Sequence, residues 1–222
     1  MKALVCYIHG KGGSAAECAH FRPLFPGRTV IGLDYPAATP WEASEALHAA
    51  LKRLKAEYAD ITLIANSIGA FFSMSAGIDA LIDRAYFISP ILDMERLILD
   101  MMARAHVTEA QLEKQGVIST AFGETLSWPY LRYVRAHPIR WNPPTEILYG
   151  ETDNLTPYET AAAFAAAHNA GLTVMEHGEH WFHTPEQMRF LDRWIHAGEI
   201  ARGASIPTPD HRANGQDNEG TR

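Results

Sequence analysis

The chain has 222 residues, of which 47% are hydrophobic and 20% charged, and its formal net charge is −7. This is the composition of a soluble globular protein, and because the sequence has no basic stretch we expect no nucleic-acid partner. It has only two cysteines, Cys6 and Cys18, which excludes a disulfide framework and leads us to expect a cytoplasmic protein. The apolar run after Met1 and Lys2 is too short for the core of a signal peptide.

Short runs of apolar and β-branched residues predict six strands. They cover residues 3–8, 29–33, 61–65, 85–88, 146–149 and 172–176. The runs are nearly continuous rather than alternating, which indicates strands that are covered on both faces. We therefore expect a three-layer α/β/α sandwich around a mostly parallel six-stranded sheet.

Helices between these strands are predicted by their start signals. Thr39, Thr156 and Thr184 are each followed by proline and, three residues after the threonine, by Glu or Gln. This pattern combines an N-cap hydroxyl with a proline at the first helical position. Residues 61–78 carry no charge and are long enough for a membrane span, but their Asn, Ser and Gly residues favour a buried strand that turns into a buried helix, with no membrane span.

The interval 92–144 is too long for a simple crossover between strands. Residues 93–105 and 108–115 have the pattern of amphipathic helices. We interpret the interval as a helical cap over one end of the sheet. After residue 197 the apolar pattern stops, so we expect one domain over residues 1–197 and a disordered tail over 198–222.

The motif His-Gly-Lys-Gly-Gly-Ser, residues 9–14, directly follows the first predicted strand. Backbone N–H groups of such a glycine-rich turn can face a pocket and hold an anion or a developing oxyanion. The spacing of Gly10, Gly12 and Ala15, with Asp34 at the end of the second strand, also fits a dinucleotide-binding fingerprint. The motif by itself leaves both interpretations open.

Ser67 lies in Ala-Asn-Ser-Ile-Gly, residues 65–69, where the third strand gives way to an apolar helix. A nucleophile elbow is a strained turn of this kind and needs small residues two positions before and after the serine. Ala65 stands where the usual pattern has glycine, and Gly69 matches. The alternative is that Ser67 is an ordinary helix N-cap.

Two later loops carry further polar candidates. Asp153 follows the fifth strand just before a helix start, where a capping aspartate is the alternative interpretation. His177, His180 and His183 follow the last strand at a spacing of three, which could converge on a metal ion in a helix. Gly178 and the following Thr-Pro indicate a loop instead, and no HExxH motif or cysteine pair is present, so we expect no metal.

The order of the candidates along the chain separates these interpretations. Ser67, Asp153 and His180 each follow a different parallel strand, at the sheet edge where ligands bind in open α/β folds. Ser, Asp, His is also the order in which hydrolases of this architecture carry their catalytic residues. A dinucleotide-binding protein would leave all three residues unexplained.

On the His-Gly-x-Gly-Gly, elbow, Gly-x-x-Asp and Gly-x-His-x-Phe motifs, the chain resembles a small serine esterase or lipase of the α/β-hydrolase superfamily, trimmed at its N-terminus. The resemblance covers about residues 1–197 and implies strand order 2-1-3-4-5-6. It implies a catalytic triad of Ser67, His180 and Asp153, with His183 as the reserve base. It also implies an oxyanion hole made by the backbone N–H groups of Lys11 and Ile68.

The activity implied is hydrolysis of carboxylic esters or thioesters of small molecules, without a cofactor or metal. Apolar residues of the cap are candidates for an acyl pocket or for simple packing onto the sheet: Met94, Ile98, Met101, Trp128 and Tyr133. His9 and Trp181 are candidates by adjacency to the motifs. The alternatives are a catalytically silent relative that binds a ligand or partner, and an NAD(P)-binding oxidoreductase.

Overall fold

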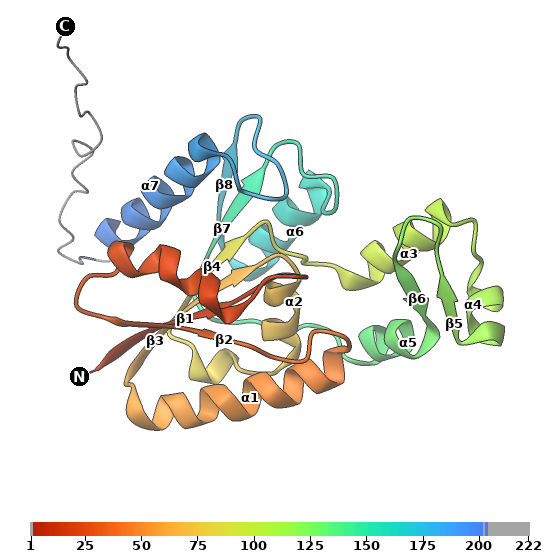
Figure 1. Ribbon diagram of the computed structural model, residues 1–222, viewed down its shortest axis with the longest axis horizontal. Helices are drawn as coiled ribbons and strands as arrows, with labels where there is room; N and C mark the ends of the chain where they lie inside the picture. Colours follow the sequence, from red (N-terminus) through yellow and green to blue (C-terminus); the bar gives the residue numbers. More distant parts are fainter. Residues whose placement is uncertain (1, 202, 204–222) are drawn as a thin grey trace, which may run out of the picture.

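The computed structural model describes residues 2–201 and 203. Its main sheet has six strands: β1 (Ala3–Ile8), β2 (Thr29–Leu33), β3 (Asp60–Asn66), β4 (Arg84–Ile88), β7 (Thr145–Gly150) and β8 (Gly171–Met175). They are arranged in the order β2-β1-β3-β4-β7-β8, and every neighbouring pair is parallel (Figure 1). The predicted parallel sheet and its strand order are therefore confirmed.

Helices cover both faces of the sheet and make two separate cores (Figure 1). The helices α1 (Pro40–Glu57), α2 (Ile68–Ser75) and α6 (Tyr158–His168) pack on one face, and η1 (Ala15–Leu24) and α7 (Pro185–Ala201) pack on the other. Alternate side chains of a strand point to opposite faces, so Ile8 of β1 enters the first core and Tyr7 the second. This is the expected three-layer arrangement.

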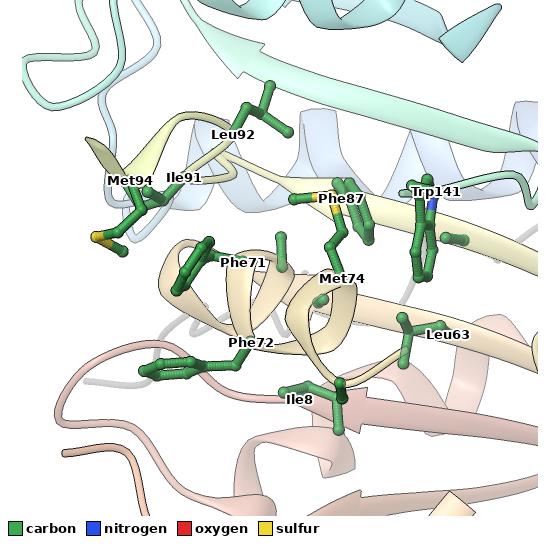
Figure 2. Close-up of a cluster of buried hydrophobic side chains, with 14 of the residues drawn as sticks. Ile8, Leu63, Phe71, Phe72, Met74, Phe87, Ile91, Leu92, Met94 and Trp141 are labelled. Carbon is green, nitrogen blue, oxygen red and sulfur yellow. The ribbon is translucent and has the colours of Figure 1, made fainter. Parts of the chain in front are cut away.

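The uncharged stretch 61–78 is β3 followed by α2, and both elements are buried. In Figure 2, Phe71, Phe72 and Met74 of α2 point in different directions, toward the neighbouring strands and toward Ile91. A helix that is buried on every side carries apolar residues on every side, which explains why α2 has no charged residue. Within residues 2–201, no helix is both long and apolar enough to cross a bilayer.

A separate group of elements extends beyond one end of the sheet (Figure 1). It comprises α3 (Met94–Arg104), α4 (Glu109–Gln115), the antiparallel strands β5 (Val117–Ser119) and β6 (Thr125–Ser127), and α5 (Trp128–Ala136). The two predicted helices are present. The hairpin was not predicted, because three-residue strands are too short to show a period in the sequence. The cap is thus helical with one hairpin.

The last helix extends past the expected end of the domain. α7 runs to Ala201, so the predicted boundary at residue 197 falls inside it. Glu199 is only 1% exposed, lies 3.3 Å from Arg28 and accepts a hydrogen bond from the Tyr86 hydroxyl at 2.8 Å. These partners hold residues 198–201 on the sheet. Apart from Gly203, the rest of the expected tail lies outside the described residues.

Candidate active site

Ser67 is the single residue between β3 and α2, and its backbone has a conformation that residues other than glycine rarely adopt. Its φ is 52° and its ψ −121°, which is costly for any residue other than glycine. Neighbouring backbone holds the turn: the Ser67 N–H donates to the Ile88 carbonyl at 2.9 Å, and its carbonyl accepts from the Ile91 N–H at 3.1 Å. The sharp turn predicted at this position is present.

The turn has little free space around it. A Cβ atom on Gly10 would lie 3.3 Å from the Cβ of Ser67, so the glycine loop and the elbow are in close contact. Ala65, which stands in place of the usual glycine, is fully buried in the first core. The extra methyl group is therefore accommodated by packing on the sheet face, and the elbow forms with alanine at this position.

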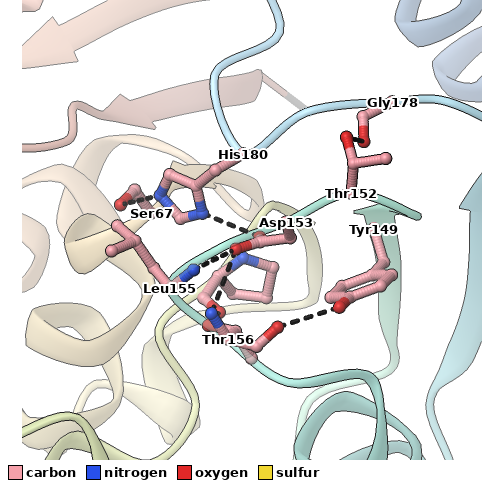
Figure 3. Close-up of polar contacts among 9 residues, drawn as sticks. Ser67, Tyr149, Thr152, Asp153, Leu155, Thr156, Gly178 and His180 are labelled. Carbon is pink, nitrogen blue, oxygen red and sulfur yellow. Dashed lines mark hydrogen bonds and ion pairs between the residues drawn. The ribbon is translucent and has the colours of Figure 1, made fainter. Parts of the chain in front are cut away.

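Three polar side chains from separate loops form one chain of hydrogen bonds (Figure 3). The Oγ atom of Ser67 lies 2.8 Å from Nε2 of His180, and Nδ1 of His180 lies 2.7 Å from Oδ2 of Asp153. The other Asp153 oxygen accepts from the N–H groups of Leu155 and Thr156, at 2.8 and 3.0 Å. With Oδ2 facing Nδ1, the His180 tautomer that fits carries its proton on Nδ1 and leaves Nε2 free to accept from Ser67.

The loops that carry Asp153 and His180 are bound to each other. The backbone N–H and the hydroxyl of Thr152 both donate to the Gly178 carbonyl, each at 2.8 Å (Figure 3). The Tyr149 hydroxyl donates to the Thr156 carbonyl at 2.9 Å and secures the far end of the Asp153 loop. Sequence analysis missed Thr152 and Tyr149, because a side chain bound to backbone leaves no pattern in the sequence.

The other two histidines of the last loop point elsewhere. His183 has Nδ1 2.7 Å from the Trp181 carbonyl and 3.5 Å from Glu179, and His177 is exposed beside two glutamates. His180, rather than the reserve His183, therefore faces Ser67. In the described part of the chain, no group of three or more His, Cys, Asp or Glu side chains could hold a metal ion.

The buried ring of His9 supports the glycine loop and lines neither cavity described below. The backbone carbonyl of His9 accepts a hydrogen bond from the Tyr35 hydroxyl at 2.6 Å. Burial raises the pKa of Tyr35, so this donor stays protonated.

Asp34, which belongs to the dinucleotide fingerprint, accepts a hydrogen bond from the Ala15 N–H at 2.7 Å. The glycine loop leads into a 3₁₀-helix, whereas a dinucleotide site requires an α-helix N-terminus there. The dinucleotide interpretation finds no support in this geometry.

Lys11 and Ile68 border the same space as Ser67. In the described residues neither backbone N–H has a hydrogen-bond acceptor, so both remain available to a ligand. The Lys11 ammonium group donates to both carboxylate oxygens of Glu124, each at 2.7 Å. This ion pair connects the glycine loop to the turn of the cap hairpin.

The first cavity, of about 630 Å³, lies between the sheet and the cap and begins at Ser67. Of the predicted acyl-pocket residues, Met94, Ile98 and Met101 line it, together with Leu97, Phe122, Leu126 and Leu155, which sequence analysis did not single out. Trp128 and Tyr133 do not line it. Trp128 packs against the first core, and Tyr133 stacks on His137 with ring centroids 4.0 Å apart. The cap residues thus divide between pocket and packing.

The second cavity, of about 730 Å³, lies on the His180 side of Ser67. Tyr7, Phe21 and the 69% exposed Trp181 contribute aromatic walls, so of the two candidates named by adjacency, Trp181 lines a cavity and His9 does not. Lys11, Ser67 and Leu155 line both cavities. The Ser67 hydroxyl therefore stands where two hollows meet, which suits a substrate that extends in two directions from its reacting atom.

Searches with the sequence match no family model and no curated protein. Among solved structures, similar ones include Est1E from Butyrivibrio proteoclasticus, with a TM-score of 0.71 and 18% identity over 90% of this chain and 88% of that one. Another is alpha/beta hydrolase domain-containing protein 10 from mouse, with a TM-score of 0.70 and 16% identity over 90% of each chain. A third is a thioesterase domain from the curacin biosynthetic pathway, with a TM-score of 0.55 and 14% identity over 87% and 91% of the two chains.

Proposed function

We propose that this chain, which has the α/β-hydrolase fold, is a serine hydrolase that cleaves carboxylic esters or thioesters. The fold alone does not determine the reaction, since this scaffold hosts many. The observation that carries the proposal is the hydrogen-bond chain from Ser67 through His180 to Asp153. The solved structures of this fold include esterases and a thioesterase domain, which supports the same reaction class here.

The geometry supports an acyl-serine mechanism. A serine hydroxyl is a weak nucleophile, so His180 accepts its proton through Nε2 as Oγ attacks the ester carbonyl. Asp153 holds the proton on Nδ1 and stabilises the imidazolium that forms. The alcohol or thiol then leaves with the proton from His180. Water attacks the acyl-serine next, with His180 again as base, which releases the acid and restores Ser67.

The oxyanion of each tetrahedral intermediate needs preorganised donors. We assign this role to the backbone N–H groups of Ile68, directly after the nucleophile, and of Lys11 in the glycine loop. One such donor typically contributes about 3–4 kcal/mol to transition-state stabilisation. Because both act through the backbone, the identity of the Lys11 side chain matters little for this step.

The first cavity suits the acyl part of the substrate. Its wall along α3 is apolar and rich in methionine, a side chain that adapts to ligands of different shape. The second cavity, with its aromatic wall, then receives the leaving group.

The reaction needs no cofactor or metal. We place the protein in the cytoplasm, since Cys6 and Cys18 are both free and buried.

Labelling with a fluorophosphonate, followed by intact-mass measurement, tests the activated serine. The wild-type protein should gain a single adduct, Ser67→Ala none, and His180→Ala should react far more slowly. His177→Ala is the matched control, because His177 is an exposed histidine of the same loop that lines neither cavity, and it should react like the wild type. Wild-type protein should also hydrolyse p-nitrophenyl butyrate, and Ser67→Ala should not.

Two outcomes would overturn the proposal. An adduct that persists in Ser67→Ala would assign the nucleophile to another residue. No adduct and no ester hydrolysis by folded wild-type protein would favour a catalytically silent protein that binds a ligand in the same cavities.

A further inference from the structure

One face of α3 forms a wall of the first cavity along nearly the whole helix. Met94, Leu97, Ile98, Met101 and Arg104 all line the cavity, at positions that share one helix face. From Met94 to Arg104 the helix rises about 15 Å. The wall is therefore apolar from its start near Ser67 and ends in a guanidinium group.

The charges around this cavity do not balance. Its charged lining residues are Lys11, Arg104 and Glu124. Glu124 is engaged by Lys11 through both of its oxygens. Arg104 has no carboxylate within ion-pair distance in the described part of the chain, although the whole chain carries a net charge of −7. Arg104 is exposed, so one cation at the cavity is hydrated rather than paired with a counter-ion.

The Arg104 guanidinium is nevertheless positioned. Its central carbon lies 4.2 Å from the centroid of the Phe122 ring, and Phe122, in the turn of the cap hairpin, also lines the cavity. The hairpin and the end of α3 lie side by side (Figure 1). Stacking on an aromatic face restricts the plane of the guanidinium but leaves its N–H donors free. A planar fork of donors matches a carboxylate.

We propose that the first cavity takes an acyl group that ends in a carboxylate, and that Arg104 binds this carboxylate. The substrate class is then the half esters, or half thioesters, of dicarboxylic acids. The apolar part of α3 contacts the methylene chain, and the uncompensated guanidinium contacts the terminal anion. This inference rests on the proposed hydrolysis at Ser67 and adds the chemistry of the acyl part.

Paired substrates test the assignment. For a series of acyl lengths, kcat/KM is measured on a p-nitrophenyl ester with a terminal carboxylate and on the neutral ester of equal length. At its preferred length, wild-type protein should favour the carboxylated ester by roughly 3-fold or more, the effect of a well-oriented ion pair at an exposed arginine. Arg104→Gln should lose this preference, Arg104→Lys should keep part of it, and added salt should weaken it.

Arg132→Gln is the matched control, because Arg132 is an exposed cap arginine that lines neither cavity. It should keep the wild-type preference. Equal kcat/KM for carboxylated and neutral esters at every length, or a preference that survives in Arg104→Gln, would overturn the inference and show that Arg104 only stacks on Phe122.

A binding measurement separates this inference from the proposed hydrolysis. Ser67→Ala protein is titrated by calorimetry with the monoamide of a dicarboxylic acid and with the neutral amide of equal length. If adding Arg104→Gln weakens binding of the carboxylated amide by roughly 3-fold or more and leaves binding of the neutral amide unchanged, the carboxylate site is supported even if no ester is hydrolysed. Ester hydrolysis without this difference would leave the proposed function standing and reject the role of Arg104.

Discussion

A Cβ atom on Gly69 would lie 2.6 Å from the carbonyl oxygen of His9. The first turn of α2 therefore lies directly against the end of β1, where the glycine loop begins. This contact places Ser67 beside Lys11, and it exists because position 69 has no side chain. The elbow and the proposed oxyanion loop are thus built as one unit.

Gly69→Ala tests this unit. Overpacking should lower the free energy of unfolding by about 1–3 kcal/mol, and the shift of Ser67 away from the glycine loop should lower kcat at least tenfold. Chemical denaturation and ester hydrolysis measure the two effects. Gly77→Ala, after the same helix, has φ +60° and open space around it, so it should cost only about 1–2 kcal/mol of backbone strain and keep its kcat. Wild-type kcat in Gly69→Ala would contradict the close-contact argument.

Asp153→Asn should lower kcat by up to about 10⁴-fold, because an amide no longer holds the proton on Nδ1 of His180. The fold should persist, since the remaining amide oxygen still accepts from Leu155 and Thr156. Glu151→Gln, in the same loop, is the control and should remain active, because the Glu151 carboxylate contacts the backbone N–H and the ring of His177 rather than His180. A drop of less than tenfold in Asp153→Asn would reject Asp153 as the residue that orients His180.

Met101→Trp should shorten the first cavity and change acyl preference. Each methylene that no longer fits should cost roughly 10-fold or more in kcat/KM, so activity on long acyl chains should fall while butyrate esters are still cleaved. Leu99→Trp is the control, because Leu99 is on the same helix and partly buried but lines neither cavity. An unchanged chain-length profile with a lower melting temperature would show that Met101 only packs the cap.

The cap should also be sensitive to acid through Arg135. This residue donates to both oxygens of Glu109, at 2.7 and 2.8 Å, and to Glu95, and these hydrogen bonds hold the pKa of Glu109 below its ordinary value of 4.5. A carboxyl group whose pKa is lower in the folded than in the unfolded protein stabilises the fold at pH values above its unfolded-state pKa. This stabilisation is lost as the pH falls through the folded-state pKa. Arg135→Met should therefore melt below the wild type at pH 7, with a difference that shrinks below pH 4.5.

Thermal melts at several pH values measure this difference. Arg132→Met, on the same helix, should melt like the wild type throughout. A difference between wild type and Arg135→Met that stays constant from pH 7 to pH 3 would show that Arg135 contributes packing rather than charge.

The sequence by itself determined the strands of a parallel sheet and the loops that carry Ser67, Asp153 and His180, whereas the strand order was implied by the resemblance to the α/β-hydrolase superfamily. Each of these residues follows a buried apolar run of about five residues, and such runs are local features that a short window reveals. Parallel strands align their carboxyl ends at one edge, so predicting the strands already placed the three loops together. Gly69 and the elbow context were visible for the same reason.

Only the tertiary structure decided which side chains face one another. It decided that His180 rather than His183 faces Ser67, which depends on the conformation of their loop. It also decided how the cap residues divide between cavity and packing, and that Lys11 pairs with Glu124, more than 100 positions away. The tertiary structure also decided that Arg104 has no counter-ion, because the residues around its guanidinium come from several segments of the chain. Burial and backbone preference are encoded locally, whereas distances between loops are set by the packing of the whole chain.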